Sequence, residues 1–183
     1  MTNNIEKMDK VDSVHIILAV RRSKENEGQT HKDELCFREI IRGTQQDTIN
    51  KIKARISNLP GTWRLYQTVN ARDTAKATRM LMHELLDNFN EHHWRVDSLY
   101  KKMLLQTFCR KTKRFMLDLD DKSKVFEVKR LLESYKVNEL MYLETPNGYH
   151  IIVEPFNLNE VKLPKEVTLV KDGYFFLEKL EIK

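Results

Sequence analysis

Short apolar runs alternate with helical stripes along this chain, and together they predict both strands and helices. Two continuous, β-branched runs at 14–20 and 35–41 predict buried strands, which a polar loop could join into a hairpin. Alternating apolar and polar residues at 62–69 predict a half-buried strand. The remaining predicted strands are 115–120, 139–143, 149–153, 166–170 and 174–180.

Apolar residues spaced three and four apart predict four amphipathic helices, at 44–58, 74–89, 94–109 and 123–135. Pro60-Gly61 ends the first helix, and Asn70 or Asp73 could cap the second. From residue 63 onward the predicted order is strand, two helices, strand, helix and four strands. This order is typical of an α+β fold. We expect an RRM-like antiparallel or mixed sheet backed by helices, with an N-terminal strand pair and helical segment.

The chain length fits one α+β domain. Its 183 residues would form this domain over 13–183, after a polar stretch at 1–12 that we expect to be flexible. Apolar residues make up 40% of the chain and charged residues 32%, so a core can form beneath a highly charged surface. The net charge of +5 and the pI of about 9.1 favour an anionic partner such as nucleic acid.

Cysteine usage and hydropathy indicate a reducing compartment. Cys36 and Cys109 lie far apart, match no metal-binding spacing and are expected to be free thiols. No apolar stretch approaches the ~20 residues of a membrane span, and the first residues are too polar for a signal peptide. We therefore expect a cytoplasmic protein with no membrane partner.

The clearest chemical signal is an apolar strand that ends in carboxylates, Phe115-Met-Leu-Asp118-Leu-Asp120-Asp121. Side chains on a strand alternate between faces, so Asp118 and Asp120 project to the same side, about 7 Å apart. Two carboxylates in this arrangement repel each other unless a cation or basic groups lie between them, and carboxylates are ligands that Mg²⁺ or Mn²⁺ prefers. Alternatively, Asp120 or Asp121 is only the N-cap of the helix at 123–135.

Two further residues could belong to the same site. His150 follows the turn Thr145-Pro-Asn-Gly148 directly into an apolar strand, where it could contact a phosphate or perform acid–base work. The alternative for His150 is a structural histidine at a sheet edge. Asp172, in Lys171-Asp172-Gly173, could be a third carboxylate that folds back to the metal, but an Asp-Gly hairpin turn is the simpler interpretation.

Basic residues close to these motifs could bind a nucleic-acid backbone or a triphosphate. A solvated charged face is the alternative interpretation. Trp63 and Tyr66 could stack bases, although aromatic residues on strands usually belong to a core. The basic candidates are Arg64, Arg72, Arg110, Lys111, Lys113, Arg114 and Lys171.

These motifs resemble the catalytic core of the archaeo-eukaryotic primase (primase-polymerase) superfamily. The whole chain is similar to small phage-type members. The first family motif, an apolar strand ending in Asp-x-Asp, is similar to Phe115-Met-Leu-Asp118-Leu-Asp120. The second, a small residue, any residue and a histidine that enters a strand, is similar to Gly148-Tyr149-His150. The third, an apolar residue followed by Asp, is approximated by Val170-Lys171-Asp172, in which a lysine intervenes.

The resemblance covers residues 62–180 and implies template-dependent nucleotidyl transfer. Asp118, Asp120 and Asp172 would hold the divalent cations, Mg²⁺ or Mn²⁺, and His150 would contact the phosphates of the incoming nucleotide. The cations would activate the attacking hydroxyl and neutralise the leaving pyrophosphate. The implied partners are a single-stranded template and nucleotides, and they could include a protein that completes the enzyme.

Three alternatives remain open on the sequence. The chain could be a non-catalytic nucleic-acid-binding module on an RRM-like sheet, with structural carboxylates. It could be a phage protein that binds and inhibits a host enzyme or defence system. The same carboxylates would also serve a metal-dependent nuclease.

Overall fold

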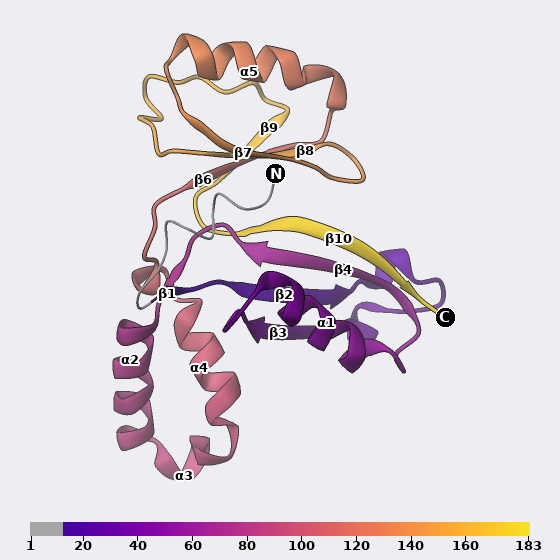
Figure 1. Ribbon diagram of the computed structural model, residues 1–183, viewed down its shortest axis with the longest axis vertical. Coiled ribbons are helices and arrows are strands. Elements are labelled where there is room, and N and C mark those ends of the chain that lie inside the picture. The colour runs from indigo at the N-terminus through magenta and orange to yellow at the C-terminus, as the bar shows by residue number, and fades with distance from the viewer. Residues whose placement is uncertain (1–12) are drawn as a thin grey trace.

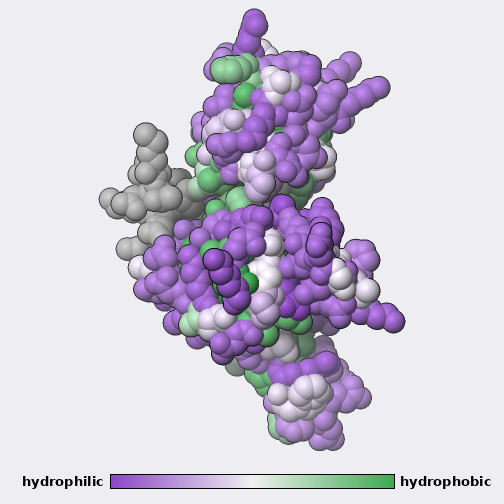
Figure 2. All heavy atoms as spheres, turned by 90° about the vertical axis from the view of Figure 1, so that its right-hand side faces the viewer, coloured by the Kyte–Doolittle hydropathy of each residue, from purple (hydrophilic) through white to green (hydrophobic). Residues whose placement is uncertain are grey.

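The protein has an α+β fold, as predicted, with three parts that follow one another along its long axis (Figure 1). The computed structural model describes residues 13–183, so the stretch expected to be flexible, 1–12, lies outside the described residues. At one end is a four-stranded sheet with a single helix, in the centre is a second four-stranded sheet, and at the other end is a helical hairpin. Polar residues dominate the face in Figure 2, and apolar residues show there in small areas, including the waist between the two sheets.

The central sheet has the strand order β10-β4-β2-β3, and every pairing in it is antiparallel. The predicted N-terminal hairpin is confirmed as β2 and β3. One face of the sheet is covered by α1, whose Ile52 and Ile56 are fully buried. Burying side chains of this size contributes about 1.5–3 kcal/mol each. The elements are β2 (Ile16–Arg21), β3 (Leu35–Ile40), α1 (Gln45–Ile56), β4 (Gly61–Thr68) and β10 (Tyr174–Ile182).

A helical hairpin projects from the end of the central sheet (Figure 1). Asp73 caps its first helix by accepting the main-chain N–H of Lys76 at 2.9 Å, as one of the two predicted caps. The helix predicted at 94–109 is shorter than expected, because 3₁₀ turns precede and follow it. The elements are α2 (Thr74–Asp87), α3 (Phe89–His92) and α4 (Val96–Leu104), and the short pair β1 (Ser13–Val14) and β5 (Arg72–Asp73) lies at their base.

The second sheet has the order β7-β8-β6-β9 and is also antiparallel. The chain runs from β6 through α5 to β7, and β8 lies between those two strands, so this is a split β-α-β unit. The RRM-like expectation is met by four antiparallel strands with a helix on one face, although the connection at 154–166 contains no second helix. The elements are β6 (Phe115–Leu119), α5 (Val125–Ser134), β7 (Glu139–Glu144), β8 (Tyr149–Val153) and β9 (Val167–Val170).

The chain crosses between the two sheets at two places. One crossing, at 110–114, leads from the helical hairpin into β6. The other, Lys171–Gly173, joins β9 in one sheet to β10 in the other, so the prediction of an Asp-Gly hairpin turn there is wrong. The sheets meet through a small apolar cluster made of Val69, Met116, Ile152 and Phe175. No helix among residues 13–183 is long and apolar enough to span a membrane.

Candidate functional site

Asp118 and His150 form a cross-strand pair where the two sheets meet. They are register partners on β6 and β8, and the Oδ1 atom of Asp118 lies 3.3 Å from the Nε2 atom of His150. Strand alternation places them on the face that meets the central sheet, because Leu117 and Leu119 face the α5 core while Met116 joins the cluster between the sheets. The structure therefore brings together two of the residues that the sequence singled out.

The ring of His150 is held by a hydrogen bond from β10. Its Nδ1 atom accepts the main-chain N–H of Phe176 at 3.0 Å. That N–H comes from β10 at an irregularity in its pairing with β4, between Phe176 and Glu178. Since Nδ1 accepts, the proton of the neutral ring is on Nε2, which faces Asp118. His150 thus presents a donor to the carboxylate, and to any anion that replaces it.

The pair differs strongly in exposure. The His150 side chain is 9% exposed, whereas that of Asp118 is 37% exposed. The histidine is therefore buried, whereas the carboxylate remains accessible to a ligand from solvent.

A tight turn holds β8 against the end of β6. In this turn, the N–H of Thr145 donates to the carbonyl of Gly148 at 2.9 Å, and the Gly148 N–H donates to the Thr145 hydroxyl at 3.0 Å. A Cβ atom at Gly148 would lie 1.8 Å from the main-chain oxygen of Leu119. Only glycine allows this backbone approach, which brings the turn directly against the main chain of Leu119 and Asp120.

Asp120 and Asp121 have different roles. Asp121 accepts the N–H of Ser123 at 2.9 Å at the start of the helical segment, so it is the cap that the sequence suggested. Hydrogen bonds from the Ser123 side chain and main chain hold the pKa of Asp121 below its usual value. Asp120 is exposed and has no hydrogen bond or ion pair with any other described residue. Of these three neighbouring carboxylates, Asp118 and Asp120 are consequently the two that do not cap the helical segment.

Asp172 lies elsewhere and is already paired. Arg72 holds it through two hydrogen bonds, from Nη1 at 2.9 Å and from Nη2 at 2.6 Å, and the Arg72 side chain is only 2% exposed. Asp172 lies in the crossing before β10 begins, whereas Phe176, which contacts His150, lies within β10. Over residues 13–183 no three His, Cys, Asp or Glu residues converge to hold a metal. The structure therefore does not bring Asp172 to Asp118 and Asp120.

Asn70 connects both chain crossings, a role that the sequence did not suggest. Its Oδ1 atom accepts the Arg114 N–H at 2.7 Å and the Thr112 hydroxyl at 3.2 Å. Its Nδ2 atom donates to the carbonyls of Arg114 at 3.2 Å and Lys171 at 3.3 Å. Because Asn70 is fully buried, these bonds satisfy main-chain groups that water cannot reach. It is not the helix cap that the sequence allowed.

The basic candidates divide into engaged and free residues. Arg72 is buried against Asp172, Arg64 pairs with Glu25, and Arg110 donates to the carbonyl of Lys171 at 3.1 Å. Lys111 lies 3.7 Å from Asp73, at long range for an ion pair. Arg114 contributes its main chain to the Asn70 network. Lys113 and Lys171 are exposed and form no ion pair within the described part of the chain.

The two aromatic candidates for base stacking lie on opposite faces of β4 and differ in burial. Trp63 is fully buried in the core under α1, and its Nε1 donates to the carbonyl of Leu59 at 3.0 Å. It is therefore unable to stack on a base. Tyr66 is half-buried on the opposite face of β4.

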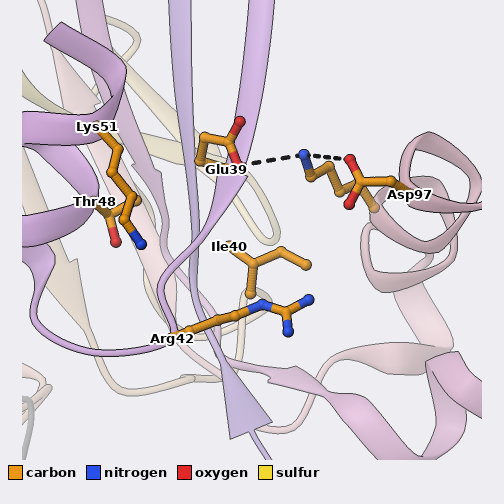
Figure 3. Close-up of a pocket in the computed structure, with 7 residues that line it drawn as sticks. Glu39, Ile40, Arg42, Thr48, Lys51 and Asp97 are labelled. Atoms are coloured by element: carbon orange, nitrogen blue, oxygen red, sulfur yellow. Dashed lines mark hydrogen bonds and ion pairs between the residues drawn. The ribbon is translucent and has the colours of Figure 1, made fainter. Parts of the chain in front are cut away.

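A cavity of about 140 Å³ lies between β3, α1 and the start of α4 (Figure 3). Lys101 bridges Asp97 at 2.8 Å and Glu39 at 3.4 Å, and so ties α4 to β3 beside this cavity. β3 and β10 form opposite edges of the central sheet, so the cavity is remote from the Asp118–His150 pair. The lining residues are Glu39, Ile40, Arg42, Thr48, Lys51, Asp97 and Lys101.

Comparison of the chain with protein-family models, with curated proteins and with solved structures finds no match.

Proposed function

We propose that this protein is a metal-dependent nucleotidyltransferase of the primase-polymerase type, acting on nucleic acid at Asp118, Asp120 and His150. The main support is the cross-strand pair of Asp118 and His150, at 3.3 Å, followed two positions later by Asp120, which has no partner among residues 13–183. Strand β6, which carries Asp118, and strand β8, which carries His150, are thus adjacent in one sheet with these two side chains on one face, and Asp120 directly follows the end of β6.

The donor set fits one hard divalent cation. Mg²⁺ is commonly bound through one or two carboxylates, with water and substrate phosphates as the other ligands. Asp118 is accessible and Asp120 is exposed, so both could accept such an ion without breaking a hydrogen bond to the main chain. Asp118 and Asp120 would hold Mg²⁺ or Mn²⁺, which would supply activation of the attacking hydroxyl and neutralisation of the pyrophosphate.

The role of His150 follows from its fixed tautomer. With Nδ1 bound to the Phe176 N–H, its Nε2–H can donate to one anionic oxygen at a time along a fixed direction. In the structure the nearby anionic oxygen is Oδ1 of Asp118, 3.3 Å from Nε2. When a nucleotide binds, a phosphate oxygen would replace it, and the Asp118 carboxylate would then be free for the cation. His150 would position the phosphate by a hydrogen bond and would not act as a general acid or base.

Direct binding of Mn²⁺, followed by electron paramagnetic resonance, tests the proposed ligands. We expect Asp118→Asn and Asp120→Asn each to weaken Mn²⁺ binding at least about tenfold, because each removes a carboxylate ligand. Asp121→Asn is the matched control, since asparagine is also a good helix cap, and it should bind like the wild-type protein. Equal affinity in all four proteins would exclude the proposed ligands.

A further inference from the structure

The face of the central sheet opposite α1 carries an apolar and aromatic row. Strand register aligns Phe176 with Tyr66, Tyr66 with Leu18, and Leu18 with Arg38 across β10, β4, β2 and β3. Register partners in antiparallel strands point to the same face. The side chains under α1 belong to the alternating positions, such as Leu65 on β4, so the row lies on the other face.

This row is not part of a core among the described residues. The four buried clusters, with the apolar side chains packed against them, include none of Leu18, Val20, Tyr66 and Phe176. All four are half-buried rather than buried, and the rings of Tyr66 and Phe176 meet edge-on with centroids 5.9 Å apart. The helical hairpin covers the sheet beside the row, at Ile16, and the cluster that it forms there does not include the row.

Basic side chains border this row on two sides. Arg38, at the end of the row, is exposed and forms no ion pair with a carboxylate in the described part of the chain. It lies next to Tyr174, whose pKa is raised by burial and partly lowered again by this guanidinium. In the next row, Lys179 is the register partner of Arg64, and each has one acidic neighbour, Glu181 and Glu25 respectively. The row itself contains no carboxylate.

An aromatic strip with arginine at its edge suits unpaired bases and a phosphate backbone. Aromatic side chains on a four-stranded sheet can stack two or three bases of a single strand, and this binding tolerates different sequences because every base has a π-face. A duplex hides its bases in the stack, so it would not use such a surface. The excess of positive charge in the chain, +5, has the sign that a polyanion requires.

The row also leads to the candidate active site. Phe176 contributes its ring to the row, while its main-chain N–H holds the ring of His150. Because one residue belongs to both features, a strand that lies along the row would arrive beside Asp118. We propose that Phe176, Tyr66, Leu18 and Arg38 form the surface that binds the single-stranded template of the proposed nucleotidyltransferase. This proposal rests on the proposed function.

The test is binding of a fluorescently labelled single-stranded oligonucleotide to the full chain, measured by anisotropy in EDTA so that metal-dependent chemistry is absent. Tyr66→Leu keeps an apolar side chain but removes the ring, and Arg38→Gln removes an exposed charge. We expect each to weaken binding at least about fivefold, as loss of one stacked base or one phosphate contact does. Tyr142→Leu and Arg130→Gln in the other sheet and its helix are the controls, and they should bind like wild type.

The outcomes separate this proposal from the proposed function. Wild-type affinity for both Tyr66→Leu and Arg38→Gln, or equal losses in the two controls, overturns the template surface, as does a wild-type protein that binds no oligonucleotide. Arg38 is exposed, so its variant remains informative if the Tyr66 variant fails to fold. Ring-dependent binding by a protein that incorporates no nucleotide would support the surface and reject the enzyme, leaving a non-catalytic binding module.

Discussion

Arg72 and Asp172 form a two-point ion pair beneath the crossing between the two sheets, with N–O distances of 2.9 and 2.6 Å. The pair sits beside Asn70, whose amide lies 3.4 Å from the same carboxylate. It assigns Asp172 a structural partner at the position where the family resemblance implies a metal ligand. The two roles predict different consequences of substitution.

Asp172→Asn should destabilise the protein strongly. It leaves the Arg72 guanidinium, 2% exposed, without its counter-charge, and breaking a buried pair on one side costs about 3–5 kcal/mol. Urea unfolding measures this loss. Replacing both residues, as in Arg72→Met with Asp172→Leu, should recover most of it, because no isolated charge remains buried.

The matched control for Asp172→Asn is Glu127→Gln, which breaks the exposed pair with Lys124 and should change stability by less than about 0.5 kcal/mol. An Asp172→Asn protein that is as stable as this control but binds Mn²⁺ weakly would contradict the structural role and favour the metal role.

Gly148→Ala should disrupt the candidate site through the backbone. The new Cβ would meet the Leu119 oxygen at 1.8 Å, so the turn or the end of β6 must move. We expect a loss of about 3 kcal/mol or more in unfolding free energy, at the upper end for overpacking. Gly43→Ala is the control, because its nearest neighbour lies 3.7 Å away and its backbone is unstrained. A Gly148→Ala protein as stable as the control would show that the turn does not contact β6.

The cap of α2 should make stability depend on pH in acid. The hydrogen bond from the Lys76 N–H lowers the pKa of Asp73 below its unfolded value of 3.8. The unfolded chain therefore binds this proton first as the pH falls. The contribution of the cap is complete above pH 3.8 and is lost as the pH falls through the folded pKa.

Asp73→Asn tests this contribution, because asparagine keeps the cap without the titrating group. The stability difference between wild type and Asp73→Asn, from urea unfolding, should be smaller at pH 3 than at pH 7. A difference that is the same at both values would contradict the assignment.

The sequence identified features that depend on local periodicity. Alternation along β6 placed Asp118 on one face, and the Gly148 turn placed His150 at the start of the neighbouring strand. Asp121 was recognisable as a cap because capping depends on residues only two or three apart.

Features that depend on contacts between distant segments could not be predicted from the sequence. Asp172 looked like a hairpin turn because Asp-Gly between two apolar runs is a local signal, whereas the split of β9 and β10 between two sheets is not. Asn70 and Arg72 receive their partners from segments 40 to 100 positions away. The N–H that fixes His150 depends on the irregular pairing near Phe176, which no periodicity encodes.

The most direct test of the central claim is template-dependent incorporation of labelled nucleotides on single-stranded DNA or RNA, with Mg²⁺ or Mn²⁺ present. We predict that the wild-type protein and Asp121→Asn incorporate nucleotides at similar rates. We predict that Asp118→Asn is slower by about a hundredfold or more, because it loses cation-dependent stabilisation worth several kcal/mol. Incorporation by Asp118→Asn at the wild-type rate, or none by the wild-type protein with any template, nucleotide or cation, would contradict the proposed function.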